Sequence, residues 1–401
     1  MANIAILGFG VVGSGVADVI AENLEIIEKR INDKLNIKYI LDLRDFPDSP
    51  FGHLVTHDFN VILNDPEVTV VAEMMGGSHP AYDFSLAALK AGKSVVTSNK
   101  EVVSKFGVEL LGVAREMGVR YMFEASVGGG IPIIRPLVND LAANSINSIN
   151  GILNGTTNYI LTQMAENGRD FADALKDAQA KGYAEANPTA DIDGIDAARK
   201  TVILASLAFG KLIDPDSIYT EGISKIGVAD IELAKEFGYS VKLIGHCEKK
   251  DGKLLATVSP RLIPTSNPLH SVDDVFNGIL VDANMLGESM FYGRGAGKLP
   301  TASAVVADII DIVKSPENDA CFPAIESAES NELFDMDGYK CKNMLVFDSK
   351  ADDRILDSFN ATEAIIRDGK VAFITEELSE KELRDKLSAL KDAPLSRIRL
   401  I

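Results

Sequence analysis

The chain has little of what marks several classes of protein. Its cysteines, Cys247, Cys321 and Cys341, are few and widely spaced, and they show neither a disulfide framework nor metal-ligand spacing. No apolar run reaches the roughly 18 to 20 residues that cross a bilayer, and the first residues lack the basic and apolar segments of a secretion signal. We therefore expect reduced, buried thiols in a cytoplasmic protein that has no membrane partner.

Positive charge is scarce as well. The 401 residues include 40 Lys and Arg against 59 Asp and Glu, which gives a formal net charge of -19. Because phosphate binding needs a basic surface, this balance argues against a nucleic-acid partner. A small anionic cofactor needs only a local pocket of amide groups with one or two cations. The hydrophobic fraction of 46% is ordinary for a soluble protein, and the length predicts two or three domains.

The first 130 residues alternate short apolar segments with helical patterns. Asn3–Leu7 is a mostly apolar run that suits a buried parallel strand, and a helical pattern runs from Val11 to about Arg30. Further strand candidates are Asn36–Leu41, Val61–Leu63, Thr69–Ala72, Ser94–Thr97 and Arg120–Phe123, with helical stretches at Ala81–Ala91 and Gly107–Met117. The alternation predicts an α/β fold with a doubly wound parallel sheet of the Rossmann type over residues 1–130.

The pattern changes after the breaker-rich turn at Gly128–Gly130. Residues 131–299 mix helices and strands without regular alternation, which predicts a second, α+β domain. Helices are expected at Ile133–Leu141, Asn158–Glu166, Phe171–Lys181 and Asp191–Phe209, and strands at Ile146–Leu153, Val241–Glu248, Leu254–Leu262 and Gly278–Asp282. The glycine-rich segment Gly293–Lys298 leads into a helix, Thr301–Lys314, which we expect to return to the first domain.

The last part of the chain follows a polar segment, Ser315–Asp335, which predicts a linker. Strands are expected after it at Cys341–Asp348, Thr362–Ile366 and Val371–Thr375, with a helix at Ser379–Leu390. Residues 335–401 are therefore expected to form a small α+β appendage.

One glycine-rich turn carries the first functional signal. Gly8-Phe9-Gly10-Val11-Val12-Gly13 follows the first expected strand and opens a helix. The first glycine permits a tight turn, the second lets the backbone approach a diphosphate, and the third lets the helix pack on the strand. The diphosphate would lie at the helix N-terminus, where unpaired N–H groups point at it. A turn without a ligand is the alternative, but the strand–turn–helix context favours a dinucleotide.

The end of the second expected strand bears on the choice between NAD and NADP. An acidic residue there binds the ribose 2′-hydroxyl, whereas an arginine accommodates a 2′-phosphate. This chain offers Asp42, Arg44 and Asp45 together. Arg44 favours NADP and Asp42 favours NAD, so the choice stays open, with NADP as the first expectation.

The densest group of charges lies in Lys181–Lys200, which holds four acids and three cations. Asp196 and Lys200 are four residues apart and so share one helix face; as a solvated ion pair they would contribute only about 0.2 to 0.5 kcal/mol. The helix that follows is apolar on nearly all sides, however, and Glu185 and Asp191 precede it in a tight loop. Acids at the mouth of a buried helix suit a site for an ammonium group, and a buried lysine beside them can relay a proton.

A second lysine follows a strand of the first domain, in Thr97-Ser98-Asn99-Lys100. Ligands of open α/β sheets gather at the carboxyl ends of the strands, which would place Lys100 near the nicotinamide. By spacing alone, a surface lysine in a loop is the better explanation.

Together these segments resemble the homoserine dehydrogenase family. The likeness runs through Gly8–Gly13, Thr97–Lys100, Glu124–Pro132 with Gly151–Leu161, and Gly182–Lys200, and it spans roughly Met1–Lys314. The last segment fits the family signature throughout, at Asn187, Pro188, Asp191, Gly194, Asp196 and Lys200. The resemblance implies an enzyme that reduces aspartate 4-semialdehyde to homoserine with NADPH or NADH, in the route to threonine and methionine.

The resemblance also implies roles for single residues. Lys200 would be the acid/base residue that gives a proton to the carbonyl oxygen, and Lys100 a second lysine near the nicotinamide and the substrate. Homoserine or aspartate semialdehyde would be bound by Glu185, Asp191, Asp196 and Thr156. The cofactor would touch the glycine turn, Arg44, Ser98, Lys100, Gly182 and Gly297. The backbone carbonyls of Glu124, Val127, Gly129 and Ile131 match the family's monovalent-cation site, which usually holds sodium.

The family likeness further implies a homodimer or a higher homo-oligomer, formed through the sheet of the second domain. Many bacterial members end in an amino-acid-binding ACT-type domain, whose first strand leads into an Asp-x-Pro-Gly turn. Here Val346–Asp348 runs into Ser349–Asp353 without Pro or Gly. We therefore expect a shortened or degenerate ACT-like domain, and feedback by threonine stays open.

Two other functions stay open at this point. Another semialdehyde dehydrogenase, of the phosphorylating kind, would need a nucleophilic cysteine, and none of the three cysteines lies near these motifs. A dinucleotide-binding regulatory protein without catalysis would have no need of Lys100, Glu185, Asp196 and Lys200, all of which are present.

Overall fold

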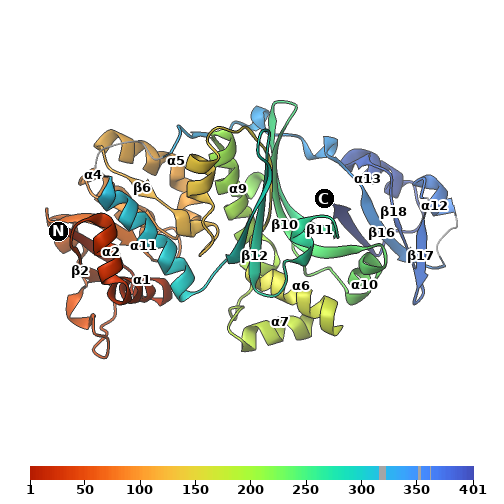
Figure 1. Cartoon of the computed structure of the whole chain (residues 1–401). Coiled ribbons are helices and arrows are strands. Elements are labelled where there is room, and N and C mark those ends of the chain that lie inside the picture. The colour runs from red at the N-terminus through yellow and green to blue at the C-terminus, as the bar shows by residue number, and fades with distance from the viewer. Residues whose placement is uncertain (316–321, 351–353, 362) are drawn as a thin grey trace. The chain divides into compact units, whose positions relative to one another are not determined.

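The computed structural model of the chain describes residues 1–315, 322–350, 354–361 and 363–401. Expectations that fall on the remaining residues, Cys321 and Thr362 among them, lie outside the described chain. The chain divides into two compact units, whose elements are labelled in Figure 1. The first unit comprises Met1–Ser145, Val202–Pro215 and Gly293–Ser327, and the second comprises Ile146–Thr201, Asp216–Tyr292 and Ala328–Ile401.

The first unit is built on a six-stranded sheet in the order β3-β2-β1-β4-β5-β6, with every neighbouring pair parallel. Its strands are β1 (Ala2–Leu7), β2 (Leu35–Leu41), β3 (Val55–Thr56), β4 (Val68–Glu73), β5 (Ser94–Thr97) and β6 (Tyr121–Met122). Its helices are α1 (Val11–Glu22), α2 (Leu24–Ile31), α3 (Phe59–Leu63), α4 (Ala81–Lys90), α5 (Lys100–Met117) and α11 (Lys298–Lys314). Every residue of β1 is buried, as expected of a central parallel strand. The strand order confirms the doubly wound Rossmann-type sheet.

Smaller elements complete the first unit. Pro136–Asp140 forms a π-helical turn where a helix was expected, and the short strands β8 (Lys211–Leu212) and β14 (Glu326–Ser327) pair with each other. Helix α11 packs against α1 of the same unit. Among the described helices, none combines the length and the hydropathy that crossing a membrane requires.

One strand expectation in this unit is wrong. Val61–Leu63 belongs to helix α3, because Asp58 caps the helix by accepting a hydrogen bond from the Asn60 amide at 2.9 Å. Three apolar residues are too few to separate a strand from a helix by periodicity.

Two helices differ in extent from the expectation. The helix expected from Val11 to about Arg30 is two helices, α1 and α2, which part at Asn23. Helix α5 begins at Lys100, earlier than expected, because the side chain of Asn99 accepts from two backbone amides of its first turn.

The second unit is built on a mixed sheet in the order β13-β12-β7-β10-β11-β20-β16-β18-β17, with β9 paired to β11. Its strands are β7 (Ile146–Ile152), β9 (Tyr219–Thr220), β10 (Tyr239–Lys250), β11 (Lys253–Pro264), β12 (Phe276–Ala283), β13 (Gly287–Arg294), β16 (Asn343–Asp348), β17 (Ala364–Arg367), β18 (Lys370–Ile374) and β20 (Ser396–Leu400), with a separate pair β15 (Lys340–Cys341) and β19 (Leu378–Ser379). Its helices are α6 (Gly155–Asn167), α7 (Phe171–Ala180), α8 (Thr189–Ile192), α10 (Val228–Glu236), α12 (Arg354–Ser358) and α13 (Glu380–Ser388), together with the first part of α9 (Ile195–Phe209).

The long hairpin of β10 and β11 forms the middle of this sheet, and most of its residues are buried. The C-terminal strands continue the same sheet: β20 pairs in parallel with β11 and antiparallel with β16. A small core that includes Leu345, Phe347, Phe359, Phe373 and Leu383 lies under these last strands. The ACT-like character of this segment stays a prediction.

Several elements of the second unit were not anticipated. The helix expected at Asp191–Phe209 is broken into α8 and α9, because Gly194 adopts a φ of +83° between them. Strand β13 was missed, since its residues are mostly half-exposed and carry no regular alternation. Helix α10 and strand β20 were missed as well. The thiols of Cys247 and Cys341 are buried and free, as expected.

Candidate active site

The glycine turn between β1 and α1 leaves space beside its second glycine. Gly8 adopts a φ of +88°, which favours glycine. A Cβ atom on Gly13 would lie 1.9 Å from the Gly8 carbonyl oxygen, so only glycine lets α1 begin this close to the strand. A Cβ atom on Gly10 would meet no atom within 4 Å. The turn is therefore closed tightly, while its edge at Gly10 is open to the approach of a diphosphate.

A cavity of about 530 Å³ opens beside this turn, within the range of small-molecule sites. It is lined by the glycine turn, by the carboxyl ends of β2 and β4, and by apolar side chains that include Phe59, Met75 and Phe84. In open α/β sheets, ligands bind outside the carboxyl ends of the strands. The turn and the cavity together fit the diphosphate and adenosine parts of a dinucleotide.

Asp42 and Arg44 form an ion pair at this cavity. One oxygen of Asp42 accepts from the amide of Phe9 at 2.8 Å, and the other accepts from Nε of Arg44 at 3.0 Å. The hydrogen bond from Arg44 lowers the pKa of Asp42 to about 2, although burial acts in the opposite direction. The Arg44 side chain remains 65% exposed. The two residues that bear on the choice between NAD and NADP thus lie side by side, and each neutralises the charge of the other.

A buried acid at the end of β4 organises the neighbouring loops. Glu73 is fully buried; its carboxylate accepts from the Thr97 hydroxyl at 2.7 Å and from the Met75 amide at 2.6 Å. The Thr97 hydroxyl accepts in turn from the Asn99 amide at 2.9 Å, and the Asn99 side chain donates to the Gly77 carbonyl at 2.8 Å. These bonds tie the loop after β4 to the start of α5, whose first residue is Lys100. Lys100 is therefore held at a helix start, beside a buried network.

Burial raises the pKa of Glu73 to about 7, although hydrogen bonds from Thr97 and Met75 act in the opposite direction. Because the folded-state pKa lies above the usual 4.5, the folded protein binds more protons than the unfolded chain between these values, and stability falls as pH rises through that window. We expect Glu73→Gln to remove this pH-dependent loss in the free energy of unfolding, which is roughly 3 kcal/mol between pH 4.5 and 7. Chemical denaturation at several pH values checks it, with the exposed-acid variant Glu109→Gln as a control that keeps the wild-type slope. Equal slopes in all three proteins would refute the assignment.

The loop after β6 combines a buried acid with closely packed glycines. The carboxylate of Glu124 is 1% exposed and accepts from the amides of Ile133, Ile134 and Arg135 at 2.7 to 2.9 Å. Burial raises the pKa of Asp308, which accepts from the Glu124 amide, to about 8, against the opposing effect of Arg135. Because three backbone amides occupy the Glu124 carboxylate, the part of Glu124 that can serve the expected cation site is its backbone carbonyl.

The glycines of this loop leave no room for side chains. A Cβ atom on Gly128 would lie 2.4 Å from the Ile131 carbonyl oxygen, and one on Gly129 would lie 2.3 Å from the Gly295 carbonyl oxygen. Within the described residues, no backbone hydrogen bond between elements ends on the carbonyls of Val127, Gly129 or Ile131. The loop is therefore one that only glycine fits, and these three carbonyls are not used in backbone bonds to other described elements.

In the second unit, the acidic segment and the strand before α6 come together. Lys200 is buried; its Nζ lies 2.8 Å from an Asp196 oxygen and donates to the Leu153 carbonyl at 2.7 Å. The side-chain amide of Asn154 donates to Asp191 at 2.7 Å and to the same Asp196 oxygen at 2.9 Å. The pair of Asp196 and Lys200 is thus a buried ion pair within a hydrogen-bonded cluster, not a solvated one.

The other expected site residues are placed more loosely. Thr156, in the first turn of α6, donates to the Tyr183 carbonyl at 2.6 Å. Glu185 is exposed, and in the described chain no hydrogen bond or ion pair joins its carboxylate to the Lys200 cluster. Gly182 and Gly297 adopt φ values of +74° and +125°. Gly182 belongs to the unit of Lys200, and Gly297 to the unit of the glycine turn.

Two residues of these sites were not identified from the sequence. Asn154 follows a strand and caps α6 by accepting from the Thr157 amide at 2.9 Å, a position that an Asn before a helical pattern could have suggested. Its contacts with the acids are 37 and 42 residues away in the chain, and no local pattern indicates them. Glu73 gave no signal beyond being an acid at the end of a buried strand.

The parallel sheet with its glycine turn, together with a buried lysine–carboxylate cluster in a second unit, defines a dinucleotide-dependent oxidoreductase of two parts. Residues 8–124 match the family model described as the NAD binding domain of homoserine dehydrogenase, and residues 132–310 match the model described as homoserine dehydrogenase. The chain belongs to the homoserine dehydrogenase family, whose members are NAD(P)-dependent oxidoreductases.

Relatives support this membership along the whole chain. A homoserine dehydrogenase from Neisseria gonorrhoeae is 39% identical over 427 residues, which cover 99% of this chain and 98% of that protein. A homoserine dehydrogenase from Thiobacillus denitrificans is 34% identical in sequence, and its crystal structure matches with a TM-score of 0.90. The match covers 100% of this chain and 98% of that chain. A hyperthermophilic archaeal homoserine dehydrogenase mutant in complex with NADPH is 30% identical with a TM-score of 0.66, and covers 77% of this chain and 97% of its own.

Proposed function

We propose that the protein interconverts L-homoserine and L-aspartate 4-semialdehyde with NADP or NAD, in the synthesis of threonine and methionine. The observation that carries the proposal is the buried Lys200, held between Asp196 and the Leu153 carbonyl in a member of this family. When bound, the nicotinamide supplies or takes up the hydride. The protein then has to bind the amino-acid substrate and move one proton at its C4 oxygen.

Lys200 is the group that we propose for the proton transfer. When hydride reaches the aldehyde carbon, negative charge develops on the oxygen, and an ammonium group nearby both stabilises that charge and supplies the proton. In the reverse direction the lysine removes the hydroxyl proton of homoserine. Asp196 and the Leu153 carbonyl fix the position of Nζ in the resting enzyme. Lys100, at the start of α5, is proposed as the second lysine near the reacting atoms.

The acids of the cluster are proposed to bind the substrate's ammonium group. Asp191 and Asp196 are oriented by Asn154, so their carboxylates are held before substrate arrives. Thr156 and Glu185 are the further proposed substrate residues; because Glu185 is exposed, it would have to move toward the cluster when substrate binds.

We propose that the cofactor binds along the glycine turn, with its diphosphate against Gly10 and its adenosine in the cavity beside Asp42 and Arg44. The exposed guanidinium of Arg44 supports NADP, because a 2′-phosphate could take over its pairing with Asp42. Ser98, Gly182 and Gly297 are the further proposed cofactor contacts. An NADPH complex is known for the archaeal relative.

A monovalent cation, sodium in the first place, is proposed to bind the carbonyls of Glu124, Val127, Gly129 and Ile131. The crowded glycines of this loop support the site, as do the carbonyls of Val127, Gly129 and Ile131, which accept no backbone hydrogen bond from another described element. Replacing sodium and potassium in the assay with tetramethylammonium, which is too large to enter such a ring, should lower turnover several-fold, and sodium should restore it in a saturable way. Activity that is independent of the cation at constant ionic strength would contradict the proposal.

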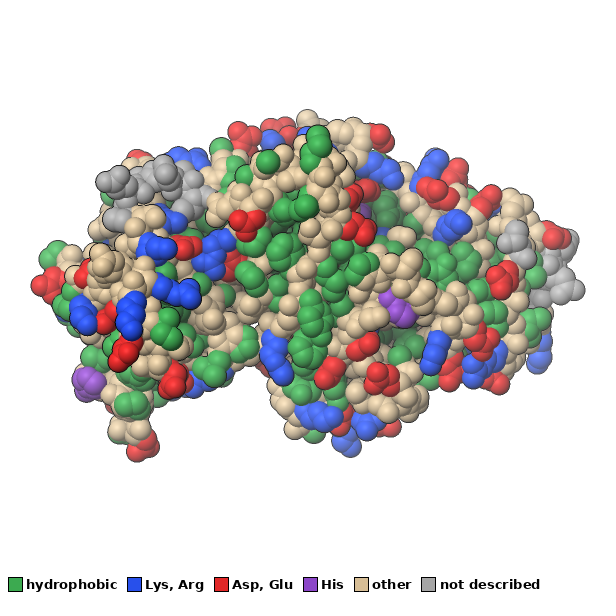
Figure 2. Space-filling model, viewed as in Figure 1, with side chains coloured by type: hydrophobic (Ala, Val, Ile, Leu, Met, Phe, Trp, Pro, Cys, Tyr) green, Lys and Arg blue, Asp and Glu red, His purple; other side chains and the backbone are tan. Residues whose placement is uncertain are grey.

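We also propose a cytoplasmic homodimer or higher homo-oligomer that associates through the sheet of the second unit. The support is the edge strand β13, on which Met290 and Phe291 are only half-buried and Tyr292 is 55% exposed. Apolar side chains are visible over this part of the sheet in Figure 2. Light scattering of the purified protein would give the mass directly.

The test of the proposed function is the appearance of reduced cofactor. Purified protein is mixed with L-homoserine and either NADP or NAD, and absorbance of the reduced nicotinamide is followed. We expect turnover, and faster turnover with NADP. Binding of cofactor without turnover on either dinucleotide would show a regulatory protein instead, and would overturn the proposal.

A further inference from the structure

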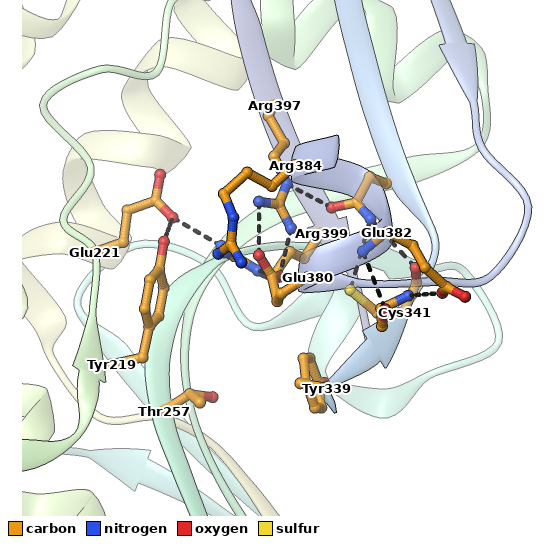
Figure 3. Close-up of polar contacts among 12 residues, drawn as sticks. Tyr219, Glu221, Thr257, Tyr339, Cys341, Glu380, Glu382, Arg384, Arg397 and Arg399 are labelled. Carbon is orange, nitrogen blue, oxygen red and sulfur yellow. Dashed lines mark hydrogen bonds and ion pairs between the residues drawn. The ribbon is translucent and has the colours of Figure 1, made fainter. Parts of the chain in front are cut away.

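A second cavity lies in the second unit, between β9, α13 and β20. It is open and measures about 450 Å³. Three arginines line it: Arg384 comes from α13, and Arg397 and Arg399 come from β20. Figure 3 shows their guanidinium groups together with Glu380 and Tyr219. In a chain with a net charge of -19, three cations around one small cavity call for an explanation.

The deepest of these cations are held rigidly. Arg399 is 3% exposed; it donates from Nε to Glu380 at 2.9 Å and from Nη1 to Glu221 at 2.8 Å, and its guanidinium lies over the Tyr219 ring, 4.5 Å from the centroid. Arg397 grips the Glu380 carboxylate with both terminal nitrogens. Planar groups that are fixed in this way lose little further freedom when they bind a ligand.

The third cation is held more loosely. Arg384 is 57% exposed and forms a two-fold pair with Asp337, at 2.9 Å for each bond. Arg384 and Arg399 each place two hydrogen bonds on carboxylates, out of the five N–H donors that a guanidinium has. Glu380 is the only carboxylate among the residues described as lining the cavity. Both guanidinium groups therefore keep N–H donors beyond those that they place on carboxylates.

The lining also indicates what kind of anion fits. Guanidinium groups on two different elements, α13 and β20, approach the cavity. A phosphate monoester presents three terminal oxygens that point in different directions, so it can accept hydrogen bonds from groups on both elements. Leu387, Ala393 and Pro394 add an apolar wall that suits a small carbon group. Glu380 already accepts from Arg397 and Arg399, which leaves no carboxylate in the lining for the ammonium of an amino acid.

We infer that this arginine-lined cavity binds a small phosphate monoester and that its occupancy changes the affinity of the enzyme for homoserine. The first half of the inference stands on the cavity alone. The second half rests on the proposed function, because it needs the substrate cluster to be where we place it.

A short chain of contacts leads from the cavity to the substrate cluster within the same unit. Glu221, the partner of Arg399, begins the segment that continues through Gly222 to Ile223. The Ile223 amide donates to the Ile192 carbonyl at 2.9 Å, and a Cβ atom on Gly222 would lie 2.1 Å from that same oxygen. Ile192 ends α8, directly before the turn that leads to Asp196. An anion bound to the remaining donors of Arg399 would compete with Glu221 for the charge of the guanidinium without moving it, and would so weaken the hold on a segment that packs against this turn.

Binding is tested by titration calorimetry on the full-length protein, saturated with NADPH so that the dinucleotide site is filled. Ethyl phosphate is expected to bind, inorganic phosphate to bind more weakly because it lacks the carbon group, and threonine to give no heat at this site. Arg384→Gln should weaken ethyl phosphate binding at least tenfold. This substitution removes only the exposed ion pair with Asp337, so the variant should fold normally, and a thermal melting curve checks that it does. The control is Arg367→Gln. Arg367 belongs to the same C-terminal segment but pairs with Glu232 and Glu236, so this variant should bind ethyl phosphate like wild type.

If neither ethyl phosphate nor inorganic phosphate gives heat, or if Arg384→Gln binds ethyl phosphate as tightly as wild type, the proposed site is wrong. The arginines would then only anchor the C-terminal segment. The coupling has its own readout. Ethyl phosphate should change KM for homoserine several-fold in wild type and leave it unchanged in Glu221→Gln. Binding without any change in KM would overturn the coupling, and it is distinguishable from failure of the proposed function, in which no turnover occurs at all.

Discussion

Replacing Lys200 with alanine should lower turnover about 10³-fold, within the range that a positioned acid/base residue contributes. Binding of NADPH, followed by its fluorescence, should stay within a few-fold of wild type, because the glycine turn and its cavity belong to residues 8–84. The loss should appear in kcat and not only in KM, since the lysine acts on the oxygen that changes charge in the reaction.

The chain offers a matched control for this variant. Lys242 is also buried, at 3% exposure, and its Nζ also contacts a backbone carbonyl, of Val272 at 2.6 Å, and an aspartate, Asp273, at 2.7 Å. Lys242→Ala therefore removes an equivalent buried lysine from the same unit without touching the proposed site. If turnover falls equally in both variants, or falls less than tenfold in Lys200→Ala, Lys200 is not the acid/base residue.

Gly13→Ala should unfold or strongly destabilise the first unit, whereas Gly10→Ala should leave it folded and abolish tight cofactor binding. The added carbon of Gly13→Ala would lie 1.9 Å from the Gly8 carbonyl oxygen, so the turn has to open, at a cost of roughly 3 kcal/mol or more. Gly10 has a φ of -78° and no atom near its Cβ position, so alanine fits the empty protein.

The carbon added in Gly10→Ala takes the space that we assign to the diphosphate. Chemical denaturation without cofactor should place it within about 1 kcal/mol of wild type, and a titration with NADPH should show affinity at least tenfold weaker. Wild-type affinity in Gly10→Ala would mean that the diphosphate does not approach this turn.

The sequence was sufficient for the Rossmann-type sheet because each of its signals is local. An apolar strand, three spaced glycines and an amphipathic helix follow one another within the first thirty residues. Local signals failed where the deciding contact is a single cap or where a strand is exposed. Val61–Leu63 became a helix through the cap at Asp58, and β13, at the edge of its sheet, has no alternation to detect.

The charged residues of the candidate site were predictable from the sequence, but the hydrogen bonds that hold them together were not. Asp196 and Lys200 were found because a spacing of four residues places two side chains on one helix face. The contacts that bury this pair come from Leu153 and Asn154, which are distant in sequence, and only the fold brings them together. Glu73 shows the same limit, since its partner Thr97 ends the next strand of the sheet, 24 residues away in the chain.

The central claim is that this protein transfers a hydride between C4 of homoserine and a nicotinamide, with Lys200 moving the proton. Homoserine that carries deuterium on C4 tests it most directly. After incubation with NADP, mass spectrometry should find deuterium in the reduced cofactor and aspartate 4-semialdehyde as the other product, with both formed far more slowly by Lys200→Ala. Reduced cofactor without deuterium, or none at all, would contradict the account.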